Sequence, residues 1–159
     1  MARSSVDFVV VAYRDDEVWQ VQPLSQRCAD DLETLLTALR PWPSDTGAIG
    51  MVSVDEDFFV IARVLGQHTR LLLSDVTAAS EWELASGIID ELDLPEPDDD
   101  EYPQPAGDLG IVADLGVSAM DLGVLCDDED LYPDEVLADV ARRLGFGSQF
   151  QAAVDAVSV

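Results

Sequence analysis

The sequence AIGMVSVDEDFFVIARVLGQHTRLLLSDV, residues 48–76, decides the fold of this chain. It predicts three consecutive strands in the middle of an antiparallel sheet. In residues 58–65 both alternating faces are apolar, and Arg63 is the only charge. A strand of this kind belongs in the interior of a sheet, where neighbours cover it on either side. The short polar segments at 55–57 and 66–67 read as the turns before and after it.

Two more strands and a helix are predicted before this stretch. The strands, 6–13 and 17–24, are joined by the polar turn 14–16. Ser25 is a good N-cap for the helix that follows, and Pro41 stops that helix. The apolar stripe of this helix is formed by Cys28, Leu32, Leu35, Leu36 and Leu39.

A second helix is expected after the three strands, beginning near Asp75 or Thr77. Its apolar face is formed by Trp82, Ala85, Ile89 and Leu92. Superposing the chain on itself with a shift of about fifty residues places Phe8 on Phe58 and makes each half a hairpin followed by a helix. We therefore expect a weak ββα repeat, and a sheet that carries both helices on one face.

The chain changes character after residue 92. Residues 93–108 contain four prolines and a run of acids, which predicts an acidic, Pro-rich linker. Residues 109–159 are expected to form a small helical unit, because Pro133 suits a first helical position and Ser148 an N-cap. A short helix is expected before them, at about 118–126, from its apolar residues Met120, Val124 and Leu125.

The predicted domains are thus a sheet domain, 1–92, a linker, 93–108, and the helical unit, 109–159. The fold class is α+β: a five-stranded, mainly antiparallel sheet in the order ββαβββα, with two helices, followed by the C-terminal helical unit.

Charge is the most unusual property of the chain. Its 33 acidic residues face 8 arginines and no lysine, for a formal net charge of −25. Thirteen of the acids and none of the bases lie between Leu92 and Tyr132. Two continuous runs stand out there, Asp98-Asp99-Asp100-Glu101 and Asp127-Asp128-Glu129-Asp130. Such a surface repels phosphate backbones, so direct nucleic-acid binding is not expected, whereas a basic protein partner would suit it. The competing interpretation is a solvated acidic surface without a partner.

Neither a membrane nor a secretory destination is indicated. The first residues lack the apolar core of a signal peptide, and no apolar run approaches the ~20 residues that span a bilayer. The two cysteines, Cys28 and Cys126, are far apart in sequence and neither belongs to a C-x-x-C motif. We therefore expect a cytoplasmic protein with reduced thiols.

The sequence contains no complete catalytic or metal-binding motif. A zinc deaminase needs H-x-E and P-C-x-x-C, but the only histidine reads His68-Thr69-Arg70 and both cysteines are single. Acids beside Cys126 would raise its pKa and make it a poor nucleophile. A calcium loop beginning at Asp127 would place Tyr132 where glycine is required. No cofactor, metal or catalytic residue is predicted.

Several long segments together resemble one protein family. They are IGMVSVDEDFFVIARV, SDVTAASEWELA, PAGDLGIVADLG, CDDEDLYPDEVLADVARRLGFG and SQFQAAV. They are similar to the tRNA adenosine deaminase-associated proteins of high-GC bacteria, and the likeness covers nearly the whole chain. The resemblance implies a protein connected with tRNA adenosine deamination, and it supplies no catalytic residues to transfer.

The function we expect is that of a non-catalytic, acidic accessory module that binds a basic protein such as a tRNA adenosine deaminase. Its predicted binding residues are Asp98, Asp99, Asp100, Glu101, Asp127, Asp128, Glu129 and Asp130. One alternative is a small-ligand-binding protein or enzyme with a carboxylate-lined pocket, because no spacing in a sequence shows which acids meet. Another is a homodimeric structural module paired through an open sheet edge or its terminal helices.

Overall fold

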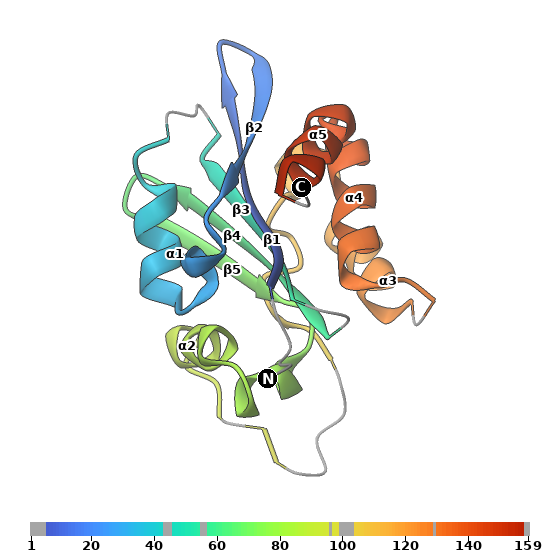
Figure 1. The fold of residues 1–159 in the computed structure, drawn as a ribbon. Coiled ribbons are helices and arrows are strands. Elements are labelled where there is room, and N and C mark those ends of the chain that lie inside the picture. The colour runs from blue at the N-terminus through green and yellow to red at the C-terminus, as the bar shows by residue number, and fades with distance from the viewer. Residues whose placement is uncertain are drawn as a thin grey trace.

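A central antiparallel sheet with helices on both faces forms the protein (Figure 1). The computed structural model describes residues 6–42, 46–54, 57–95, 97–98, 104–128 and 130–157. Within these residues the sheet has the strand order β2-β1-β3-β4-β5-β6, and every neighbouring pair is antiparallel. The strands are β1 (Val6–Asp15), β2 (Val18–Leu24), β3 (Ala48–Val54), β4 (Phe58–Leu65), β5 (His68–Leu73) and β6 (Ala106–Gly107).

The three strands expected from residues 48–76 are present, and β3 and β4 lie in the middle of the sheet. Every residue of β3 is buried, and so is every residue of β4 except Leu65. The side chains of Phe58 and Val60 enter one core of the protein, whereas those of Phe59 and Ile61 enter the other. The double-sided apolar pattern of β4 therefore reflects a strand that is covered on both faces.

The first face of the sheet is covered by α1 (Leu32–Leu39) and α2 (Glu83–Glu91). Short 3₁₀ helices, η1 (Gln26–Ala29) and η2 (Val76–Ser80), precede them. Both helices place their buried leucines and isoleucines in the same core as Val9, Val52 and Val60. The expectation of two helices on one face is confirmed.

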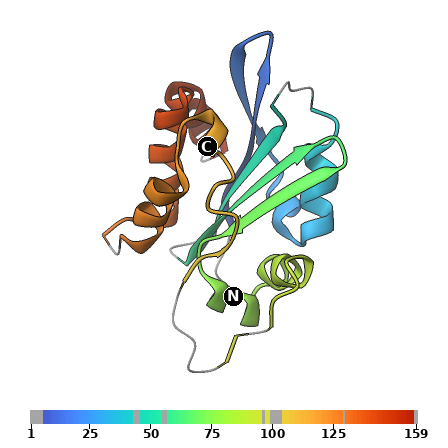
Figure 2. The ribbon, with the colours of Figure 1, turned by 180° about the vertical axis from the view of Figure 1, so that it is seen from behind.

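The opposite face is covered by α3 (Ala119–Asp127), α4 (Pro133–Leu144) and α5 (Gly147–Val157), which follow the short η3 (Ala113–Leu115). These helices share a second core with Val10, Ile61 and other sheet residues. Figure 2 shows the two groups of helices on opposite sides of the sheet. The C-terminal helices are thus packed against the sheet, while the division of the chain into domains at 92 and 108 stays a prediction.

The number of strands and the starts of two helices differ from expectation. The sheet has six strands rather than five, because Ala106 and Gly107 at the end of the predicted linker pair with β5. The helix expected from Ser25 is interrupted before Leu32, since the Asp31 carboxylate accepts a hydrogen bond from the Thr34 amide and caps a new helix. The second helix likewise begins at Glu83, after η2.

The predicted repeat holds for the order of the elements but not for their packing. Strand, strand, 3₁₀ helix and α-helix follow one another in both halves of the sheet domain. Phe8, however, faces the core of the C-terminal helices, and Phe58 faces the core of α1 and α2. A superposition of the two halves would have to place these two residues on the same face. With the fifty-residue shift, residues that match in sequence thus lie in different cores.

The helix expected at 118–126 exists, but its apolar residues are divided between core and solvent. Ser118 accepts a hydrogen bond from the Asp121 amide and caps α3, whose Leu122 and Leu125 are buried. Met120 and Val124 are exposed instead. None of the helices in the described residues has the length and apolarity that a membrane crossing requires.

Candidate functional site

Two arginines on neighbouring strands hold the chain that connects the sheet to α3. Arg63 on β4 and Arg70 on β5 are direct partners in the strand register. Arg63 is 95% buried, with 5% of its surface exposed. Its Nη1 and Nη2 donate to the two carboxylate oxygens of Asp114, at 2.6 and 2.9 Å. Its remaining donors bind the carbonyl oxygens of Thr46 and Ile111, so all five N–H groups have acceptors.

Arg70 binds the same connecting segment closer to β6. Its Nε donates to the Asp108 carboxylate at 2.7 Å and its Nη2 to the Gly110 carbonyl at 2.8 Å. We call Arg63 and Arg70 the arginine clamp. The hydrogen bonds from Arg63 hold the pKa of Asp114 below its usual range, against the opposing effect of its partial burial. The clamp therefore neutralises Asp108 and Asp114 and fixes residues 108–114 to the sheet.

A hollow lined by several aspartates lies between the end of the sheet and the loop that joins α3 to α4. Its volume is about 370 Å³. We call it the acidic hollow; it is lined by Asp57, Phe59, Ser74, Asp75, Gln104, Pro105, Leu125, Cys126, Asp127, Asp128, Leu131, Pro133 and Val136. Acids from the turn before β4, from the end of β5 and from the end of α3 are thus brought together by the fold.

The carboxylates of this hollow differ in what they already bind. Asp75 accepts hydrogen bonds from both the amide and the hydroxyl of Thr77, at 2.9 and 2.6 Å, and caps η2. Asp128 accepts one from the Asp130 amide at 2.9 Å. Asp127, Asp128 and Asp130 are exposed, and none of them has an ion-pair partner among the described residues. Their charge faces solvent.

The predicted site residues are only partly placed by the structure. Asp127 and Asp128 line the acidic hollow, and Asp130 follows them in the loop before α4. Asp98 is exposed and does not line that hollow. The other four, Asp99, Asp100, Glu101 and Glu129, lie outside the described residues. Sequence reasoning missed Asp57 and Asp75, because a turn acid and a helix cap carry no signal that they meet Asp127 in space.

The thiol at this hollow is unsuited to nucleophilic chemistry. Burial, and secondly the charge of Asp127, raise the pKa of Cys126 to about 11. Burial and the neighbouring Asp30 likewise raise the pKa of Cys28. Among the described residues, no three histidines, cysteines or acids are arranged to hold a metal ion. What the acidic hollow offers is a set of acceptors for cationic side chains.

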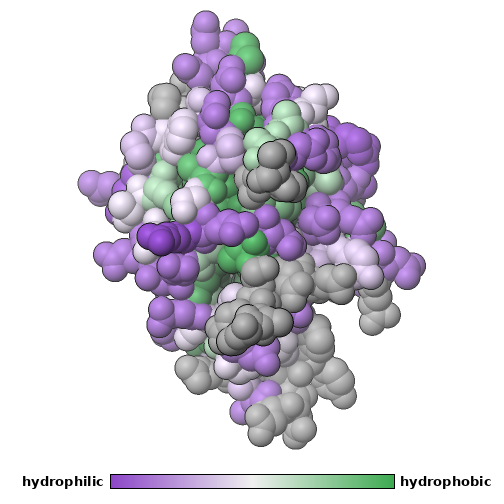
Figure 3. Space-filling model, viewed as in Figure 1, coloured by the Kyte–Doolittle hydropathy of each residue, from purple (hydrophilic) through white to green (hydrophobic). Residues whose placement is uncertain are grey.

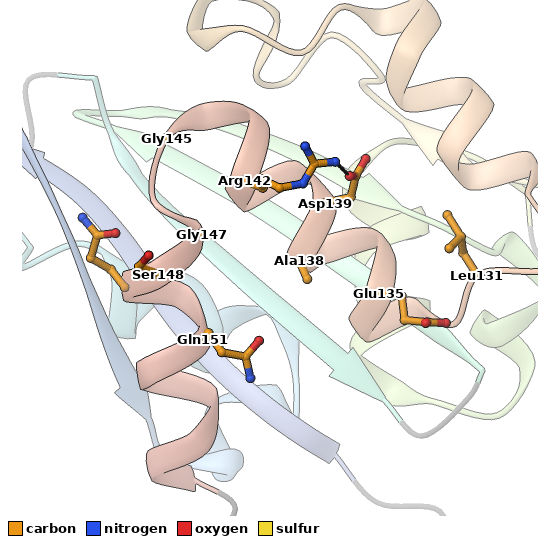
Figure 4. Close-up of a pocket in the computed structure, with 10 residues that line it drawn as sticks. Leu131, Glu135, Ala138, Asp139, Arg142, Gly145, Gly147, Ser148 and Gln151 are labelled. Carbon is orange, nitrogen blue, oxygen red and sulfur yellow. Dashed lines mark hydrogen bonds and ion pairs between the residues drawn. The ribbon is translucent and has the colours of Figure 1, made fainter.

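A larger groove, of about 910 Å³, lies between α4 and α5 (Figure 4). Its charged side chains already form ion pairs or hydrogen bonds with residues of the surrounding helices. Asp139 pairs with both Arg142 and Arg143, and Glu135 accepts a hydrogen bond from the Tyr132 amide in the capping box of α4. This groove is mixed in charge, so it has less to offer a charged partner than the acidic hollow.

Comparison with known proteins gives a family for the chain. The sequence model of the family described as "Rv3753c-like tRNA adenosine deaminase-associated protein" matches residues 7–147. The chain belongs to this family. A relative in it, Protein Rv3753c of Mycobacterium tuberculosis (strain ATCC 25618 / H37Rv), is 39% identical over 151 residues, which cover 93% of this chain and 87% of the relative. The search of solved structures found no match.

The family match confirms the resemblance drawn from the sequence. The deaminase-associated family name describes an association with a deaminase rather than a deaminase. That name is compatible with the missing H-x-E and P-C-x-x-C motifs in this chain.

Proposed function

We propose that this deaminase-associated protein is a non-catalytic accessory module that binds a basic surface of a tRNA adenosine deaminase. The observation that carries the proposal is the exposure of Asp127, Asp128 and Asp130 at the end of α3 and just after it, together with the family to which the chain belongs. The proposed contact residues are Asp127, Asp128 and Asp130, continued by Glu129 and by the acids of the linker, Asp98, Asp99, Asp100 and Glu101. A surface that binds tRNA is basic, so it is the natural counterpart of such a run.

Not every acid between Leu92 and Tyr132 is available for a partner. Asp108 and Asp114 are taken up by the arginine clamp, and the Asp121 carboxylate lies 3.9 Å from Arg143. Asp127, Asp128 and Asp130 are exposed and have no ion-pair partner among the described residues, and Asp127 ends a helix whose Leu122 and Leu125 are buried in the second core. An acid held by a packed helix loses less conformational entropy on binding than one on a flexible segment.

Binding of this kind has a defined response to salt. Exposed charges attract one another over about 10 Å at 0.1 M ionic strength and over about 3 Å at 1 M. Complementary charge mainly accelerates association, so a complex held in this way forms more slowly and binds more weakly as salt rises.

Hydrophilic residues cover most of the face in Figure 3, with hydrophobic ones showing at its centre over the sheet.

The test is a mixture of the protein with the tRNA adenosine deaminase of the same organism, analysed by size-exclusion chromatography with light scattering at low and high salt. We expect a heteromeric mass at low salt that dissociates at high salt. The triple variant Asp127→Asn, Asp128→Asn, Asp130→Asn should bind about tenfold or more weakly at low salt. It should also show a flatter salt dependence.

The matched control is the triple variant Asp15→Asn, Asp16→Asn, Glu17→Gln. It also removes three exposed charges, but at the β1–β2 turn. If both triple variants weaken binding equally, the effect is that of net charge and not of this segment. Two separate masses for the wild-type proteins at both salt concentrations would overturn the proposal, and a ligand for the acidic hollow would then be the next candidate. A homodimeric mass for the protein alone would support the structural module instead.

A further inference from the structure

The outward side of α3 combines exposed apolar residues with acidic residues, of which Asp127 and Asp128 at its C-terminal end have no ion-pair partner among the described residues. Met120 is 78% exposed and Val124 64% exposed, which makes them the two most exposed large hydrophobic side chains of the described residues. They are four residues apart, so they are neighbours on one side of the helix. Leu122 and Leu125 on the opposite side already provide the packing of α3 against the second core.

Acids border these two side chains along the same helix. Asp121 stands beside Met120, while Asp127 is the last residue of α3 and Asp128 its C-cap. A helix C-terminus carries partial negative charge, so acids there are unfavourable for the helix itself. We call Met120, Asp121, Val124, Asp127 and Asp128 the outer face of α3. This helix lies at the edge of the molecule, on the far side of the sheet from α1 and α2 (Figure 1).

We propose that the outer face of α3 is the docking surface for a basic amphipathic helix of the deaminase. Its apolar side chains would cover Met120 and Val124, and its arginines or lysines would pair with Asp127 and Asp128. This inference rests on the proposed function and names the kind of segment that is bound. Two anchors one turn apart match the spacing of apolar residues along a partner helix.

The negative charge of the chain argues against a second copy of it as the partner that covers the outer face of α3. Each copy carries a formal net charge of −25, and two outer faces would bring their acids into contact. A neutral apolar helix would cover Met120 and Val124 but leave Asp127 and Asp128 without cationic partners. Asp121 already lies 3.9 Å from Arg143, and a segment that is both apolar and basic complements the other four residues of this face.

The methionines provide a direct test. The chain has three, of which Met120 is on the outer face and Met51 is completely buried in the sheet. With ¹³C-labelled methionine methyl groups, adding the deaminase should shift or broaden the NMR signal of Met120 and leave that of Met51 unchanged. Assignment follows from the signal that disappears in Met120→Gln.

Two synthetic peptides separate the apolar requirement from simple charge attraction. One is a lysine-rich helix with leucines at i and i+4, and the other has serines in place of the leucines. The first should shift the Met120 signal at concentrations at least about tenfold lower than the second. Equal shifts from both peptides would overturn the inference, because charge alone would then explain the contact.

Variants complete the test with the deaminase itself. The double variant Met120→Gln, Val124→Gln should weaken the complex about tenfold or more while leaving its salt dependence in place. The control Val18→Gln, Leu65→Gln changes two other exposed apolar residues and should bind as the wild type does. If the deaminase binds but neither the Met120 signal nor the double variant responds, the docking surface is wrong and the proposed function stands. If the deaminase does not bind at all, the proposed function and this deaminase assignment both fail, whatever the peptides show.

Discussion

The two faces of the sheet are covered by helices in different ways. The layer of α1 and α2 rests on the sheet through apolar side chains such as Leu35, Leu39 and Ile88. The layer of α3, α4 and α5 has a comparable apolar core, but the chain that leads to it is also held by Arg63 and Arg70. Apolar contacts are non-directional, whereas the planar guanidinium of arginine fixes the position of its partners. The C-terminal layer, reached through a long connection, is thus positioned by directional hydrogen bonds as well as by apolar packing. Arg63 also binds the connection after α1, at the Thr46 carbonyl.

The largest effect that tests this difference is expected from Arg63→Ala. The substitution removes the donor that binds the Thr46 and Ile111 carbonyls and the Asp114 carboxylate. The Asp114 side chain is 56% exposed, so water can solvate it in the variant, and most of the cost comes from the carbonyls and the lost packing of the arginine. We expect a loss of about 3–5 kcal/mol in the free energy of unfolding, measured by urea denaturation at pH 7, because each buried acceptor that loses its donor costs about 1–3 kcal/mol. The control Arg40→Ala removes an exposed arginine and should change it by less than about 0.5 kcal/mol. A loss below about 1 kcal/mol for Arg63→Ala would show that the clamp does not hold the layer.

A pair of leucine truncations compares the apolar parts of the two layers. Leu35 on α1 and Leu137 on α4 are both completely buried. Leu35→Ala and Leu137→Ala should each lower the free energy of unfolding by about 2–5 kcal/mol, because each leaves a cavity. If the two losses differ by less than about 1 kcal/mol, apolar packing stabilises both layers equally, and the two arginines are what distinguishes the layers. A much smaller loss for Leu137→Ala would mean that the C-terminal layer depends little on apolar packing.

Acid should weaken the C-terminal layer through Asp114. The pKa of this carboxylate is lowered in the folded protein by Arg63, so its ionised form favours folding. That contribution is present above the unfolded pKa, about 3.9, and is lost as the pH falls through the lower folded value. The stability difference between the wild type and Asp114→Asn should therefore shrink as the pH is lowered from neutral, as thermal unfolding midpoints would show. Asp15→Asn, at the β1–β2 turn, serves as the charge-matched control; an equal dependence there would contradict the prediction.

The smallest effect is expected for the outer half of the clamp. The Arg70 side chain is 41% exposed and that of Asp108 is 40% exposed, so solvent screens their ion pair. Arg70→Ala should cost about 1 kcal/mol or less, well below the cost of Arg63→Ala, in the same urea experiment. Equal losses for the two arginines would remove the distinction between the buried Arg63 and the partly exposed Arg70.

The sheet was largely predictable because its signals are local. Apolar runs bounded by short polar turns predicted β1 to β5, and β4 begins and ends where expected, at Phe58 and Leu65. The two-residue strand β6 has no alternation to detect and exists only because β5 offers an open edge. The split of the first helix at Asp31 could have been found from its capping side chain, since aspartate at that position competes with a continuous helix.

The candidate site was predictable only in composition. The acidic run at 127–130 was evident, but the meeting of Asp127 and Asp128 with Asp57 and Asp75 depends on how α3 and α4 pack against the sheet. The outward direction of Met120 and Val124 was hidden for a related reason. In α3 the apolar residues surround the helix, so periodicity did not distinguish the side that is buried from the side that is free.

The sequence by itself determined the strands, the acidic character and the family, because alternation, composition and long matching segments are properties of the chain order alone. Tertiary structure decided which face each residue joins. It placed Phe8 and Phe58, which match in the shifted sequence, on opposite sides of one sheet. It also gave Arg63 its partners some fifty residues away. Such contacts depend on distances through space, and an arginine that looks like a lone charge in its strand is therefore recognised as an anchor only in the folded chain.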